Sequence, residues 1–198
     1  GKCGRFLALT ASSINAADSL YAGIADYYVL QAHKGELLAQ LQAASLSGDL
    51  AADNALIEQL INALQAQSIT QMPEGNLASH QSIIDELCDG DDVEVIAARF
   101  AALDTDDKWL QRAKAGIAGG SPLAIKWIFR QLSICADLSL REVFLREIIL
   151  ATNIIRHPEF SEGVRALLID KDQQPKWQFA HLAEVPEAAV DAFFVAPC

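Results

Sequence analysis

Apolar residues recur along most of this chain at the spacing of an α-helix, and this pattern constrains the fold more than any other feature. One stripe consists of Leu56, Ile57, Leu60, Ile61 and Leu64, and another of Val93, Ile96, Ala97, Phe100 and Leu103. Such stripes are typical of helices that bury one face in a core. Alanine and leucine are the commonest residues, at 33 and 25 of 198. The sequence therefore predicts a mainly α-helical chain.

Two helix starts are marked by their own signals. Ser121 precedes Pro122, which places an N-cap before a proline at the first helical position. Ser139 is followed three residues later by glutamate, which is a capping box. These signals predict helices over 121–136 and 139–156.

One segment departs from the helical pattern. Residues 24–29 follow Gly23 and are rich in β-branched and aromatic side chains, so they predict a short strand. A single strand needs a partner for its backbone hydrogen bonds, and the chain downstream offers no second convincing strand. Since the one methionine is Met72, we expect this chain to be part of a longer protein whose upstream half supplies the sheet. Residues 24–29 and the helix over 6–9 would then expose apolar surface.

Composition excludes several classes of protein. A hydrophobic content of 52% argues against disorder, no apolar run is long enough to span a membrane, and a net charge of −11 disfavours nucleic acid as a partner. The charge is unevenly spread: residues 69–107 hold ten acidic and one basic residue, and residues 108–156 hold eight basic and three acidic. The acidic stretch fits a solvated surface. The basic stretch either complements it or forms a cationic rim for a phosphate-bearing ligand.

Residue types that carry chemistry are scattered. Cys3, Cys88, Cys135 and Cys198 form no CxxC pair, which favours reduced thiols and a cytoplasmic location. The four histidines form no HExxH pattern, and no nucleophile elbow or Walker loop is present. The acidic pairs Asp106–Asp107 and Asp170–Asp172 lie in polar loops, where nothing raises a carboxyl pKa. From the residues alone we predict no catalytic residue, no metal site and no cofactor.

The start of the chain resembles the crotonase (enoyl-CoA hydratase/isomerase) superfamily. Residues 5–10 read RFLALT, and residues 16–25 read AADSLYAGIA, close to the superfamily's LALTG helix and its A.DA…G(I/L)A segment. The resemblance implies that the parent protein has the α/β crotonase fold. It also implies that Gly23 ends a helix and directs the chain toward the sheet.

A narrower resemblance comes from the other end. Residues 160–177 read FSEGVRALLIDKDQQPKW, which closely resembles the F.EGVRA.LIDKD..PKW segment of 3-hydroxyisobutyryl-CoA hydrolases, and the helix start at Ser121 resembles their SP.S.K motif. This implies three parts: the end of the crotonase core over 1–30, a helical insertion over 31–120, and a C-terminal helical segment over 121–198 that covers the acyl-CoA pocket.

The resemblance implies hydrolysis of a 3-hydroxyacyl-CoA thioester in valine breakdown, with the catalytic residues upstream of Gly1. The partners implied are an acyl-CoA substrate and the missing N-terminal half, with no nucleic acid or membrane and with room for a homo-oligomer. In a eukaryote the location would be the mitochondrial matrix. Lys171 is the residue nearest to the superfamily's CoA-contacting basic position. Two alternatives remain open, a crotonase-fold hydratase or isomerase and a non-catalytic helical interaction module.

Overall fold

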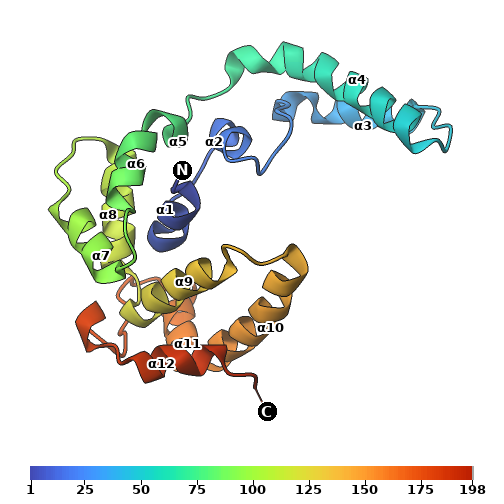
Figure 1. The fold of residues 1–198 in the computed structure, drawn as a ribbon. Coiled ribbons are helices and arrows are strands. Elements are labelled where there is room, and N and C mark those ends of the chain that lie inside the picture. Colours follow the sequence, from blue (N-terminus) through green and yellow to red (C-terminus); the bar gives the residue numbers. More distant parts are fainter. Residues whose placement is uncertain (198) are drawn as a thin grey trace. The chain divides into compact units, whose positions relative to one another are not determined.

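The computed structural model describes residues 1–197, and within them the chain is mainly helical, as predicted (Figure 1). It divides into two compact units, one formed by residues 1–12 and 84–198 and the other by residues 13–83. The three-part division drawn from the sequence concerns the parent enzyme and stays a prediction.

The smaller unit, residues 13–83, is built from helix pairs. Its elements are α2 (Ala16–Tyr21), η1 (Gln31–His33), α3 (Lys34–Ala43), α4 (Leu50–Ser68), η2 (Ile69–Gln71), α5 (Asn76–Ser79) and the first residues of α6 (Gln81–Leu87). Helix α3 packs on α4, and α2 packs on α5. The fully buried carboxylate of Asp18 holds the second pair together, because it accepts the backbone N–H groups of Asn15 (3.0 Å) and Leu77 (2.7 Å).

The strand predicted over residues 24–29 is wrong, and no strand occurs among residues 1–197. Gly23 has a φ of 70° and ends α2 as expected. The chain then runs along α4, where side chains take the place of a partner strand. The Tyr28 N–H donates to Gln65 Oε1 (2.8 Å), and the Leu30 N–H donates to Ser68 Oγ (3.1 Å). Ile24 is 68% exposed, in agreement with the expected apolar surface.

The larger unit begins with α1 (Cys3–Thr10), which packs against helices far along the chain. The first half of the larger unit also contains α7 (Val93–Ala102), α8 (Lys108–Gly119) and the last residues of α6. The Phe6 ring lies 5.0 Å from that of Trp109 and 5.7 Å from that of Phe100, centroid to centroid. Phe6 and Leu9 are buried. The expectation that this helix exposes its apolar residues is therefore wrong, because α8 and α7 cover them.

The second half of the larger unit contains both of the helices predicted from their start signals. Its elements are α9 (Pro122–Cys135), α10 (Leu140–Arg156), α11 (Pro158–Val164), a π-helix, η3 (Arg165–Ile169), and then η4 (Leu182–Glu184), α12 (Glu187–Asp191) and η5 (Ala192–Phe194). Ser121 and Ser139 cap α9 and α10 as predicted. Their core is formed by Leu123, Leu150, Val185, Val190 and Phe193.

The basic helix faces complement the acidic stretch at one point in this unit. Lys126 on α9 lies 3.0 Å from the carboxylate of Glu94 on α7. Arg130, one turn further along α9, pairs with Glu187 and Asp191 on α12. These ion pairs join α9 to its neighbours, so part of the basic stretch is used within the fold.

Candidate functional site

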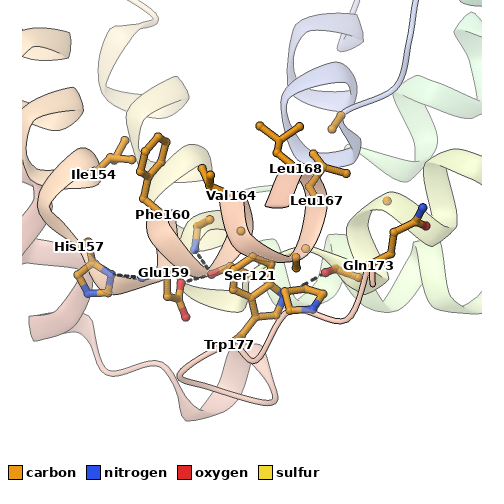
Figure 2. Close-up of a pocket in the computed structure, with 18 of the residues that line it drawn as sticks. Ser121, Ile154, His157, Glu159, Phe160, Val164, Leu167, Leu168, Gln173 and Trp177 are labelled. Atoms are coloured by element: carbon orange, nitrogen blue, oxygen red, sulfur yellow. Dashed lines mark hydrogen bonds between the residues drawn. The ribbon is translucent and has the colours of Figure 1, made fainter. Parts of the chain in front are cut away.

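The larger unit contains a cavity of about 750 Å³ beside α11, and its lining is mostly apolar (Figure 2). One wall is made of small residues from the ends of α1 and α8 and the start of α9. These are Ala11, Ala115, Gly116, Gly119, Gly120 and Ala124. The lining also includes large apolar side chains, which are Trp127, Ile154, Phe160, Val164, Leu167, Leu168 and Phe193. Such a lining suits a ligand with an apolar body.

The polar groups of this cavity are bonded to one another. The Ser121 hydroxyl caps α9 and donates to the Glu159 carboxylate, which also accepts the Gln178 N–H (2.9 Å). His157 caps α11, since its Nδ1 accepts the Glu159 N–H at 3.3 Å (Figure 2). Because these groups serve as caps, they form a structural frame for the wall.

Contacts in the structure account for the glycine and the tryptophan of the FSEGVRA…PKW segment, which are Gly163 and Trp177. The Trp177 indole N–H donates to the Gly119 carbonyl (3.0 Å), which ties the C-terminal loop to the end of α8. A Cβ added to Gly163 would lie 3.3 Å from the edge of the Trp177 ring. The glycine therefore makes room for the indole.

Arg165 fixes the loop that follows the π-helix. Its guanidinium donates to both carboxylate oxygens of Glu162 (2.8 and 2.9 Å) and to Oδ2 of Asp170 (2.6 Å) and of Asp172 (2.7 Å). It also donates to the Gln174 carbonyl (3.1 Å). Sequence reasoning placed Asp170 and Asp172 in a polar loop and missed this cluster. The signal was present in the sequence, because Arg165 stands within seven residues of all three acidic partners.

The π-helix presents three consecutive apolar side chains. Leu167, Leu168 and Ile169 are 64%, 62% and 69% exposed, and the first two line the cavity. The i+5 hydrogen bond from the Asp170 N–H to the Arg165 carbonyl (2.8 Å) defines the wide turn. This turn ends in the loop that Arg165 holds, so the Arg165 cluster positions the cavity wall.

Lys171 lies just beyond that turn. It is exposed, has a φ of 56° and is not part of the cavity lining, although Gln173 and Pro175 of the same loop are. Lys171 is therefore close in sequence to residues that line the cavity, but it does not line the cavity itself. Its contact with a CoA group stays a prediction.

Acid should loosen this loop through Glu162. The Arg165 guanidinium and the Lys176 N–H bond the Glu162 carboxylate and lower its pKa from 4.5 to about 2. A lowered pKa in the folded state stabilises the fold above pH 4.5, and that stabilisation disappears as the pH falls toward about 2. We expect the urea midpoint of the full-length protein to fall across this range. Glu162→Gln should lack that part of the decrease, and an identical pH profile in both proteins would contradict the assignment.

Two other kinds of feature are absent from residues 1–197. No group of three or more histidine, cysteine, aspartate or glutamate side chains is placed to hold a metal ion. No helix in this part of the chain is both long and apolar enough to cross a membrane. Among the described residues Cys3, Cys88 and Cys135 form no disulfide, and Cys198 lies outside the described residues. Burial raises the pKa of Cys88 to about 11, which keeps this thiol protonated at neutral pH.

Comparison with known proteins identifies the class of this chain. A family model described as enoyl-CoA hydratase/isomerase matches residues 1–194, so the chain belongs to that family. Two solved structures share its fold. One, a carnitinyl-CoA dehydratase from Mycobacterium thermoresistibile, is 30% identical with a TM-score of 0.80, and the match covers 98% of this chain and 52% of that one. The other, an enoyl-CoA hydratase from Rhodobacter sphaeroides, is 27% identical with a TM-score of 0.75, covering 98% and 51%.

The curated relatives include proteins of one particular group within this family. The chain is 36% identical to the mitochondrial 3-hydroxyisobutyryl-CoA hydrolase of Danio rerio and 35% identical to that of Gallus gallus, and each match covers 98% of this chain and 49% of the relative. The chain thus spans about half the length of the curated relatives it matches. The family resemblance found in the sequence is confirmed.

Proposed function

We propose that this chain is the C-terminal part of a hydrolase that cleaves a 3-hydroxyacyl-CoA thioester, with 3-hydroxyisobutyryl-CoA as the substrate. The observation that carries the proposal is the similarity over 98% of the chain to relatives named as hydrolases of that thioester. The apolar cavity supports it, because such a wall suits the acyl and pantetheine parts of an acyl-CoA. If the source organism is a eukaryote, the mitochondrial names of these relatives support a location in mitochondria.

In this proposal the chemistry resides upstream. Backbone N–H groups of the N-terminal half stabilise the oxyanion formed at the thioester carbonyl, and a carboxylate there acts as nucleophile or base. The described chain contributes the wall of small and apolar residues that covers the bound acyl-CoA and excludes water from it. No cofactor beyond the CoA of the substrate is required.

The test is a thioesterase assay on the full-length protein. Incubation with 3-hydroxyisobutyryl-CoA should release free thiol, which a colorimetric reagent detects. The second candidate, a hydratase, is favoured by the structural likeness to an enoyl-CoA hydratase. Hydration of crotonyl-CoA with no thiol release above background would replace the first proposal with the second. Absence of both activities would favour a non-catalytic helical module.

We also propose that Lys171 contacts the adenine or phosphate end of CoA. Its exposed position at the end of the π-helix leaves the ammonium group available to a phosphate. An exposed charge pair of this kind is weak, so Lys171→Gln should raise the KM for the thioester about two- to fivefold and leave kcat unchanged. Lys108→Gln, an exposed lysine at the start of α8, is the control. Equal KM values in both variants would refute the contact.

A further inference from the structure

Helix α10 carries apolar side chains on two of its faces. One face is turned into the larger unit, where Leu150 belongs to the core and Ile154 packs against it. The other face forms a stripe with the helical spacing i, i+4, i+8, i+11 and i+15, and its members are Leu140, Phe144, Ile148, Ala151 and Ile155. A helix with apolar residues on both sides is typical of one that is covered from more than one direction.

The larger unit leaves this stripe open. Helix α10 lies at an edge of the unit and packs on η5 and α11 (Figure 1). The four large side chains of the stripe are between 57% and 72% exposed. Proteins rarely expose so continuous an apolar surface unless another protein surface covers it.

We propose that the stripe on α10 packs against the upstream half of the full-length protein. The inference rests on the proposed function, in which this chain is the C-terminal part of a hydrolase. The match covers 49% of each curated relative, and the proposed function places the remaining length upstream of Gly1. The helix over residues 6–9, which was expected to meet that half, is covered by α7 and α8. The stripe on α10 has no such cover.

The rim of the larger cavity favours the same occupant. Phe160, Leu167 and Leu168 line the cavity but are largely exposed, and Figure 2 shows them pointing to the same side. Under the proposed function the catalytic groups lie upstream, so the upstream half has to reach the ligand across this open rim. The stripe ends at Ile155, beside the cavity residue Ile154, and α10 leads directly into α11. A surface that covers the rim can therefore continue onto the stripe.

The borders of the stripe indicate the chemistry of the surface that covers it. By helical spacing, Arg141 lies along one side of the stripe and Glu147 along the other, and both are exposed. An apolar centre with a polar rim is the usual composition of a protein interface. Because the two bordering charges have opposite signs, the matching surface of the upstream half is apolar at its centre and carries no strong charge of one sign.

The test places the photoreactive residue p-benzoylphenylalanine at Phe144 of the full-length protein. On illumination this residue forms a covalent bond with groups that touch it. We expect a dominant product with the mass of one chain, in which position 144 is joined to a peptide upstream of Gly1, identified by mass spectrometry. The matched control carries the same residue at Gln111, an exposed polar position on α8, and should crosslink weakly. Ile148, one turn along the stripe, is the second labelling position if the first variant does not fold.

The other products would overturn the inference. A product with the mass of two chains would show that a second copy covers the stripe, and a bond to residues 13–83 would show that the smaller unit covers it. Crosslinking no stronger than at Gln111 would show that the stripe faces solvent. The crosslink requires no substrate, so it is independent of the thioesterase assay. Thiol release without the upstream crosslink refutes this inference alone, and the upstream crosslink without thiol release refutes the proposed hydrolase alone.

Discussion

Replacing Gly116 by alanine is expected to force α8 away from α1. A Cβ at this position would overlap the carbonyl oxygen of Thr10 and lie 3.1 Å from the Thr10 carbonyl carbon, and backbone atoms cannot move aside as a flexible side chain can. Overpacking of this kind typically costs about 1–3 kcal/mol. The gain in helix propensity from glycine to alanine, about 1 kcal/mol, offsets only part of that cost. The change should appear as a lower urea midpoint of the full-length protein.

Gly119→Ala is the matched control for this prediction. The two glycines lie on the same helix and both line the cavity, but a Cβ on Gly119 meets no atom within 4 Å. Gly119→Ala should therefore be neutral or slightly stabilising. Similar midpoints for the two variants would show that α1 and α8 do not approach each other at Gly116.

Replacing Arg165 by leucine is expected to release the loop over residues 170–177. The substitution removes every bond that the guanidinium makes and leaves the carboxylates of Glu162, Asp170 and Asp172 close together without a cation. The mutual repulsion of these carboxylates should open the loop. Local opening controls proteolysis, so tryptic cleavage after Lys171 and Lys176 should accelerate about tenfold.

Arg156→Leu serves as the control for the loop. Arg156 ends α10 and lines the same hollow as Arg165, and its guanidinium forms no hydrogen bond or ion pair with the described residues. This variant should be cleaved after Lys171 and Lys176 at the wild-type rate. The two variants are compared by mass spectrometry of the fragments, and equal cleavage rates would show that Arg165 does not hold the loop.

Several elements followed from local rules in the sequence. The helices α9 and α10 start where Ser121 and Ser139 predict, because capping depends on the side chain and on the next three backbone N–H groups. Gly23 ends α2 for a similarly local reason, since its positive φ suits glycine. The prediction of a strand over residues 24–29 was wrong. The side-chain propensities favour an extended backbone, but a strand also requires a partner strand.

In the candidate site, too, some features follow from the local sequence and others depend on tertiary contacts. The FSEGVRA…PKW segment was recognised from its letters, but the roles of its residues depend on contacts between positions up to 58 residues apart, as in the bond from Trp177 to Gly119. Gln131 on α9 is buried, and its amide has no hydrogen-bond partner among the described residues, but nothing in the sequence indicated this. Whether an amide is buried and unpaired depends on the packing of α9 against α10, which no local pattern encodes.

The sequence by itself determined the helical class, the two capped helices and the family, because periodicity, caps and motifs are properties of neighbouring residues. Tertiary structure alone decided which faces are covered. It buried Phe6 and Leu9 under α7 and α8, left Leu167, Leu168 and Ile169 exposed beside a cavity, and enclosed Gln131 without a partner. Burial and hydrogen-bond satisfaction depend on elements that meet only in the folded chain, and the site is defined by these two properties.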